Sequence, residues 1–292
     1  MQFPPYPVAL SGAAFLEVHG HRGCRGLLPE NTLPAFLHAL ALGVDVLELD
    51  VVISHDNQVV VSHEPWLSAS LGSGPAGEAI DPRQPQQFNL YKLTYATIRE
   101  CRVGEKPHPD FPSQQPVPAY RPLLREVLQA VELACHTLRR PPVGYSVEVK
   151  SSPAGDDIFH PRPAFFVDLV VAELVAAQLL SRTTLLSFDP RVLQYARQAA
   201  PLLRQCLLVE RPAQSLLVCL RQLGFIPDTL GPDFTLLSAA MVQELRLAYP
   251  GLRLVPWTVN YVADLRQVAC WGVDGITTDY PNRLLQLLGR SK

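Results

Sequence analysis

The segment VLELDVVI at residues 46–53 is an apolar, β-branched run of the kind that forms a buried strand. A helix-like stretch at residues 33–42 precedes it, with Asn31 or Thr32 placed to cap its start and Gly43 placed where a helix would end. The same alternation of strand-like and helix-like runs continues along most of the chain. It predicts βα units and therefore a parallel sheet.

The alternation is regular enough to predict a closed fold. Strands are expected at residues 15–19, 46–53, 145–149, 183–188, 205–209, 234–237, 252–259 and 275–278. The sixth lies beside a turn-rich stretch, 224–233, that can be read in more than one way. Helices are expected at residues 33–42, 123–138, 164–180, 191–199, 213–223, 239–248, 262–271 and 282–288. We therefore predict the α/β class and a (β/α)8 TIM barrel, with its active site at the carboxyl ends of the strands.

Length and composition agree with one barrel domain. The 292 residues, 48% of them hydrophobic, are enough for a single large core that spans residues 1–292. Residues 66–120 interrupt the alternation with sequence rich in Pro, Gly, Ser and Gln. We interpret them as an insertion after the second strand, which is either a loop that binds substrate or a surface excursion without a function.

Charge and targeting signals exclude several classes of function. A net charge of -2 gives no reason to expect nucleic acid as a partner, and the six cysteines have no zinc-binding spacing. The first 20 residues lack the basic region of a signal peptide, and no apolar run is long enough to span a membrane. We therefore expect a cytoplasmic protein without stable membrane association. The oligomeric state is left open.

Charged residues recur two apart at the ends of two predicted strands. Glu48 and Asp50 share one face of the predicted strand 46–53, and Glu148 and Lys150 repeat the pattern in SVEVK at residues 146–150. If both strands point inward, three carboxylates and an ammonium group meet at one rim. Converging buried carboxylates need a counter-charge, and oxygen ligands suit Mg²⁺ or Ca²⁺ better than zinc. For each acid alone, an ion pair that lines the barrel is the alternative.

Two histidines flank these strands and could carry acid–base chemistry. His21 lies in HGHRG after the first strand, and His63 lies in VVVSHEP after the second. Histidine titrates near neutral pH, so the pair can supply one base and one acid to the cleavage of a phosphodiester. His19 could compete with His21 for the role. Arg22 has the geometry to bind a phosphate, or it could form a salt bridge with Glu30.

An ordered set of motifs covers almost the whole chain: HRG at 21–23, LPENTLPAF at 28–36, ELDV at 48–51, VVSHE at 60–64, SVEVK at 146–150, SFDP at 187–190, PWTVN at 256–260 and GVDGITTDYP at 272–281. The set resembles the signature of the glycerophosphodiester phosphodiesterases, which are TIM barrels related to phospholipase C. Two departures are visible. SHDN at 54–57 replaces a Thr-Lys-Asp-Gly turn, although Asn57 can adopt positive φ, and Glu64 follows His63 where Asp is commoner.

The resemblance implies a phosphoric diester hydrolase that converts small glycerophosphodiesters to glycerol 3-phosphate and an alcohol. It implies His21 and His63 as the catalytic acid–base pair and one divalent cation, Mg²⁺ or Ca²⁺, as the cofactor. It further implies Glu48, Asp50 and Glu148 as metal ligands. Arg22 and Lys150 would hold the phosphate, and Trp257 would line the pocket for the glycerol group.

Two alternatives remain at this stage. The first is a phospholipase that acts on a membrane lipid phosphodiester, which would need an apolar docking surface. Trp66, Leu67, Phe111 and Tyr120 in the insertion could form one. The second is a non-catalytic phosphoester-binding protein, which would be expected to have lost some of the catalytic positions.

Overall fold

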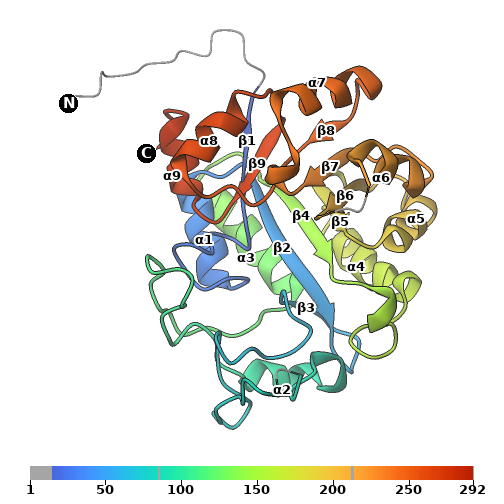
Figure 1. The fold of residues 1–292 in the computed structure, drawn as a ribbon. Coiled ribbons are helices and arrows are strands. Elements are labelled where there is room, and N and C mark those ends of the chain that lie inside the picture. Colours follow the sequence, from blue (N-terminus) through green and yellow to red (C-terminus); the bar gives the residue numbers. More distant parts are fainter. Residues whose placement is uncertain (1–14, 85, 212–213, 292) are drawn as a thin grey trace, which may run out of the picture.

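A computed structural model describes residues 15–84, 86–211 and 214–291 of the protein. Within these residues, eight parallel strands follow the order β8-β7-β6-β5-β4-β2-β1-β9 (Figure 1). They are β1 (Glu17–Gly20), β2 (Val46–Ile53), β4 (Gly144–Val149), β5 (Thr183–Ser187), β6 (Arg204–Val209), β7 (Thr229–Pro232), β8 (Arg253–Leu254) and β9 (Gly275–Thr278). The segment after β8 closes the barrel, because Val259 N donates to Thr277 O and Thr277 N donates to Pro256 O, both at 3.0 Å. The predicted TIM barrel is confirmed.

Helices cover the outside of the barrel (Figure 1). They are α1 (Leu33–Leu42), α3 (Leu124–Thr137), α4 (Pro163–Ala176), α5 (Pro190–Ala199), α6 (Leu216–Leu223), α7 (Ala239–Ala248), α8 (Val262–Ala269) and α9 (Pro281–Leu287). The caps predicted for α1 are present: the Thr32 side chain accepts a hydrogen bond from Ala35 N, and Gly43 ends the helix at φ 105°. Local sequence signals therefore define where this helix begins and ends.

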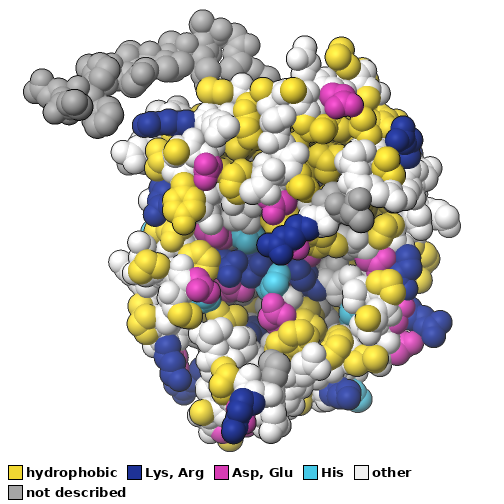
Figure 2. Space-filling model, in the orientation of Figure 1, with side chains coloured by type: hydrophobic (Ala, Val, Ile, Leu, Met, Phe, Trp, Pro, Cys, Tyr) yellow, Lys and Arg dark blue, Asp and Glu magenta, His cyan; other side chains and the backbone are white. Residues whose placement is uncertain are grey.

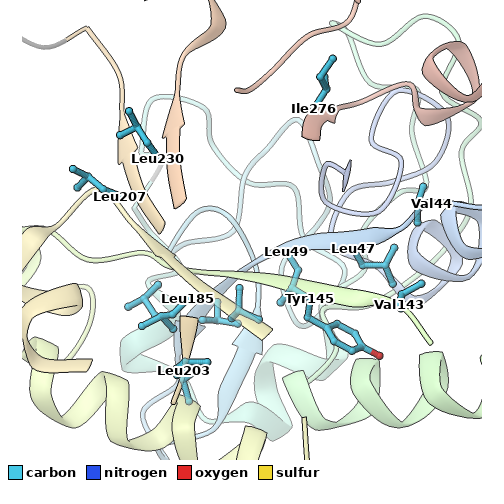
Figure 3. Close-up of a cluster of buried hydrophobic side chains, with 14 of the residues drawn as sticks. Val44, Leu47, Leu49, Val143, Tyr145, Leu185, Leu203, Leu207, Leu230 and Ile276 are labelled. Carbon is cyan, nitrogen blue, oxygen red and sulfur yellow. The ribbon is translucent and has the colours of Figure 1, made fainter. Parts of the chain in front are cut away.

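The main core lies between the strands and the surrounding helices. Leu47 and Leu49 of β2 are fully buried there, and Figure 3 shows them in the same cluster as Leu185 of β5 and Leu207 of β6. Since side chains alternate along a strand, Glu48 and Asp50 project to the opposite side, into the barrel. Apolar packing on the outside of β2 thus aims its carboxylates inward.

The sixth predicted strand was wrong. Residues 234–237 include a 3₁₀ turn, Phe234–Leu236, and the strand is β7, which lies inside the stretch interpreted as turns. Its Gly231 is required by close packing, because a Cβ there would lie 2.7 Å from the Leu208 side chain. Pairing with β6 therefore overrides the local turn signals. The start of the predicted helix 213–223 falls outside the described residues, and α6 begins at Leu216.

Residues 66–120 lie between the short antiparallel strand β3 (Val59–Val61) and α3, and they contain the short helix α2 (Tyr95–Glu100). The segment is packed rather than loose. It shares a small apolar cluster with β2 and β3, made of Val52, Val60, Leu67, Ile80, Leu90, Ile98, Cys101 and Leu123. It therefore holds a defined position beside the end of β2. No helix of the described residues is long and apolar enough to cross a membrane.

Candidate active site

The three predicted metal-ligating acids meet at the carboxyl ends of β2 and β4. Asp50 and Glu148 are direct neighbours in the parallel register, and Glu48 lies two residues earlier on the same face. Glu48, Asp50 and Glu148 are buried, and one carboxylate oxygen from each lies within 4.8 Å of the others. The convergence expected from strand alternation is therefore present.

Basic groups compensate part of this negative charge. Lys150 Nζ lies 2.7 Å from Glu148 Oε1 and 3.7 Å from Asp50 Oδ1, while Arg22 Nε lies 3.2 Å from Asp50 Oδ2. Burial raises the pKa of Glu48 well above its usual range, and repulsion from Asp50 and Glu148 adds to this effect. Burial also raises the pKa of Glu148. The ionised forms of Glu48 and Glu148 are therefore not fully compensated by the nearby positive charges.

Asp50 shows where additional positive charge would fit. Its Oδ2 accepts a hydrogen bond from Asn31 Nδ2 at 2.9 Å, whereas its buried Oδ1 has no hydrogen-bond partner among the described residues. Burial opposes ionisation of Asp50, but the charges of Arg22, His63 and Lys150 hold its pKa well below the usual range. An ionised oxygen that accepts no hydrogen bond and has its lysine partner at 3.7 Å, beside two further carboxylates, fits a hard divalent cation. The cluster could hold a metal.

His21 follows β1 and is held by a carboxylate that the sequence analysis did not assign. Its Nδ1 lies 2.6 Å from Asp279 Oδ1, and its Nε2 lies 3.9 Å from Glu48 Oε2. Because a carboxylate only accepts hydrogen bonds, Nδ1 carries the proton and Nε2 faces the acids with its lone pair. Burial lowers the pKa of His21 although Asp279 opposes this shift. The imidazole is therefore held neutral in one tautomer.

Asp279 is itself fixed by two hydrogen bonds. Asn260 Nδ2 donates to Asp279 Oδ2 at 2.7 Å, and Asp279 N donates to Asn260 Oδ1 at 2.9 Å. Asp279 directly follows β9, which pairs with β1 in the barrel. Asp279 lies in the motif GVDGITTDYP, two residues after Thr277 and therefore on the same, inward face. This spacing could have identified Asp279 as a site residue from the sequence.

The second histidine reaches the same cavity from the end of β3. His63 Nδ1 lies 2.8 Å from Glu64 Oε1, and its side chain is about a quarter exposed. Glu64 therefore orients the ring, and Nε2 is the ring nitrogen that Glu64 does not bind. His19 does not compete with His21, because its Nε2 bonds to Glu17 further down the barrel at 3.0 Å.

Arg22 forms the salt bridge with Glu30 that its position in the sequence suggested. Its Nη1 donates to Glu30 Oε1 at 2.8 Å, and Arg25 Nε lies 2.7 Å from the other Glu30 oxygen. Burial opposes the charge of Arg22, but Asp50 and Glu30 raise its pKa. The guanidinium is thus a permanent cation held beside the acids.

A cavity of about 590 Å³ lies inside the barrel, and its lining includes His21, Arg22, Glu48, His63, Glu148, Lys150 and Trp257. Figure 2 shows basic, acidic and histidine side chains gathered in a hollow on this face. Trp257 presents its ring to the cavity, because its Nε1 donates to Gly231 O at 2.7 Å and its ring packs edge-to-face on Phe188 at 5.5 Å. A mixed apolar and charged cavity of this size suits a small phosphoester.

The motifs and the barrel are matched in known proteins. Residues 21–283 match the model of the Glycerophosphoryl diester phosphodiesterase family. The chain belongs to this family. A glycerophosphodiester phosphodiesterase of Bacillus altitudinis is 27% identical over 274 residues, which are 93% of this chain and 97% of the relative. The protein is accordingly a phosphoric diester hydrolase with glycerophosphodiester phosphodiesterase activity.

Solved structures agree with this assignment. A structure from Silicibacter pomeroyi named after the same family has a TM-score of 0.81 and 32% identity, with 96% of each chain covered. A phosphodiesterase of Oleispira antarctica, solved with its product sn-glycerol-3-phosphate, has a TM-score of 0.72 at 20% identity and covers 96% of this chain and 98% of its own. At that identity the second likeness shows the fold.

Two of the four apolar insertion residues that were considered for a membrane-docking surface, Leu67 and Phe111, are buried in the structure. Leu67 is 1% exposed and Phe111 is 8% exposed, and both pack inside the protein. The guanidinium carbon of Arg25 lies 4.5 Å from the centre of the Phe111 ring. The predicted surface was therefore wrong for these two residues. Trp66 instead lines a second pocket that also includes Glu148 and Lys150.

Proposed function

We propose that the protein hydrolyses glycerophosphodiesters to glycerol 3-phosphate and an alcohol, with one bound Mg²⁺ or Ca²⁺ and a two-histidine mechanism. The observation that carries the proposal is the cluster of Glu48, Asp50 and Glu148 with the unpartnered Asp50 Oδ1, in a structure where His21 and His63 line the same cavity. When bound, the cation would neutralise the carboxylates and withdraw charge from the phosphate oxygens.

The basic side chains would bind the phosphate. Lys150 already bridges Glu148 and Asp50, so its ammonium group lies where an anionic oxygen would approach the acids. Arg22 adds a second fixed positive charge at the same rim. Both would stabilise the charge that develops on the phosphate oxygens during the reaction. Trp257 would pack against the glycerol group in the cavity.

The histidines would move the protons. His21 Nε2, with Nδ1 committed to Asp279, would accept the proton of the attacking group, which is either water or a neighbouring hydroxyl of the substrate. His63 would donate a proton to the departing alkoxide from Nε2, since Glu64 holds Nδ1. A cyclic phosphate product would identify attack by the substrate hydroxyl.

Changing the leaving group separates the two roles. With an alkyl alcohol as leaving group, His21→Ala and His63→Ala should each lower kcat by about 10²–10⁴-fold. With nitrophenolate, which departs without a proton, the His63→Ala variant should recover much of this loss and the His21→Ala variant little. Recovery in the His21→Ala variant would reverse the roles. Recovery in neither variant would remove proton donation to the leaving group from the mechanism.

The same assays test the reaction class. A panel of glycerophosphodiesters should be assayed after chelation and again after addition of Mg²⁺ or Ca²⁺. Release of glycerol 3-phosphate that depends on the added cation is expected. Hydrolysis that continues unchanged in excess chelator would refute the metal dependence, and release of phosphate on the other alcohol would refute the assignment of the glycerol side.

A further inference from the structure

A second pocket, of about 320 Å³, adjoins the acidic cluster. It shares Glu148, Lys150 and Phe188 with the main cavity, so the two spaces meet at the proposed phosphate position. A phosphodiester carries two alcohol groups on one phosphorus atom. If the glycerol group lies in the main cavity beside Trp257, the other alcohol leaves the phosphate toward this second pocket.

Three large aromatic side chains, Trp66, Phe159 and Phe188, form part of the wall of the second pocket, beside the polar residues Gln86, Ser151 and Ser152. Trp66, from the insertion, and Phe159, from the loop between β4 and α4, pack edge-to-face with ring centres 5.5 Å apart. Pro65 and Phe188 extend the apolar lining. The volume lies at the lower end of the range for small-molecule sites, roughly 300–1,000 Å³. The pocket can therefore bury part of an organic group but not a macromolecule.

Hydrogen bonds hold the two walls together. Asn89 Nδ2, in the insertion, donates to Ile158 O in the opposite loop at 2.8 Å. Within that loop, His160 Nε2 accepts a hydrogen bond from Ser152 N at 3.0 Å. The aromatic faces are thus positioned before any ligand arrives, which reduces the entropic cost of binding.

Charge in the pocket argues against a cationic occupant. Glu148 is the single carboxylate among the described residues that line it, and Lys150 Nζ already pairs with that group at 2.7 Å. The same ammonium group lies 5.8 Å from the Phe188 ring, where it would repel a second cation. Phe188 in the lining is 37% exposed and Ile158, next to Phe159 in the chain, is 49% exposed, so apolar surface continues outward from the pocket.

We propose that the pocket formed by Pro65, Trp66, Phe159 and Phe188 binds the leaving alcohol, and that it selects glycerophosphodiesters whose alcohol carries a neutral aliphatic chain. This inference rests on the proposed function, because it places the second alcohol of the same substrate. Trp66 and Phe159 are then specificity residues. Each methylene buried against them would raise the specificity constant, by at most about fourfold at full burial.

Two substrates with identical reacting groups test the proposal. Glycerophospho-N-acetylethanolamine and glycerophospho-N-octanoylethanolamine carry the same charge and the same leaving oxygen and differ by six methylenes. For the wild-type enzyme, kcat/KM should be at least about tenfold higher with the octanoyl substrate. Trp66→Ala and Phe159→Ala should each reduce this ratio to about threefold or less, and Trp66→Phe should restore much of it.

Phe15→Ala is the matched control, because Phe15 is an exposed aromatic residue that packs on Arg290 at the opposite end of β1. It should keep the wild-type ratio. An equal kcat/KM for the two substrates in the wild-type enzyme would overturn the proposal, as would a ratio that both alanine variants retain. The proposal would also be overturned, in favour of a pocket for cations, if the wild-type enzyme had a higher kcat/KM with glycerophosphocholine than with the octanoyl substrate and Trp66→Ala abolished that preference.

Failure of the proposed function would be seen separately. In that case the wild-type enzyme would hydrolyse none of these diesters with Mg²⁺ or Ca²⁺. The affinities of the two amide diesters, measured by calorimetry on the wild type and on Trp66→Ala, would then test the pocket without turnover. Equal affinities for the two diesters in the wild type would refute the apolar pocket.

Discussion

Replacing Asp279 by Asn should inactivate the enzyme by placing the proton of His21 on the wrong nitrogen. Asp279 Oδ2 accepts a hydrogen bond from Asn260 Nδ2 at 2.7 Å, so the carbonyl oxygen of an Asn at this position would occupy that place. Its amide group would then point at His21 Nδ1, now 2.6 Å from Asp279 Oδ1. An amide donates there, so Nδ1 must accept and Nε2 must carry the proton.

The size of the effect follows from the proposed role of His21 as a base. A protonated Nε2 cannot accept the proton of the nucleophile, and Asn substitutions that impose the wrong tautomer cost on the order of 10⁴ in kcat in catalytic triads. We expect about 10²–10⁴ for Asp279→Asn, and a larger effect on kcat than on KM. Asp279 is a positioning residue, because it acts through His21.

A compensating change distinguishes tautomer from charge. In the double variant Asn260→Asp with Asp279→Asn, the amide would turn toward the new carboxylate and its oxygen would again accept from His21 Nδ1. We expect the double variant to regain at least about tenfold in kcat over the single variant, which is about 1.4 kcal/mol.

Steady-state kinetics with an alkyl glycerophosphodiester should be accompanied by thermal unfolding of each variant to verify folding. A loss of less than about threefold in the folded Asp279→Asn variant would refute the tautomer argument. A large loss without rescue in a folded double variant would show that the position of the charge, and not the tautomer, is what matters.

Three further predictions follow from the described contacts. Glu148→Gln should raise the cation concentration needed for half-maximal activity by at least about tenfold, and an unchanged metal titration would remove Glu148 from the ligand set. Leu49→Ala should lower the free energy of unfolding in urea by about 2–5 kcal/mol, because Leu49 is fully buried, and a loss below about 1 kcal/mol would contradict its packing. Burial opposes ionisation of Glu17, but His19 and Arg253 lower its pKa to about 2 from 4.5, so this carboxylate stabilises the fold above pH 4.5 and loses that contribution as the pH falls to 2. Glu17→Gln should therefore cost about 1–2 kcal/mol at pH 7, after allowance for partial exposure, and a difference from the wild type that persisted below pH 2 would contradict the ion pair.

Several features could be predicted from local sequence because short-range geometry determines them. Side-chain alternation along VLELDVVI indicated that Glu48 and Asp50 share a face, and the structure places them together inside the barrel. Thr32 and Gly43 marked the ends of α1 for equally local reasons. In contrast, β7 was missed because its Gly231 and Pro232 are turn residues in isolation, and only pairing with β6 makes this segment a strand.

The sequence by itself determined the barrel and the family, because the alternation of elements and the order of motifs run along almost the whole chain, and it determined the set of acids and histidines, because residue type and spacing within one or two elements mark them. Tertiary structure alone decided how these groups are paired. His21 and Asp279 are 258 residues apart and meet because β1 lies beside β9 in the barrel. The Trp66–Phe159 wall likewise joins two loops that no local pattern connects. Barrel closure brings strand ends and loops together, and no short-range rule specifies which side chains then touch.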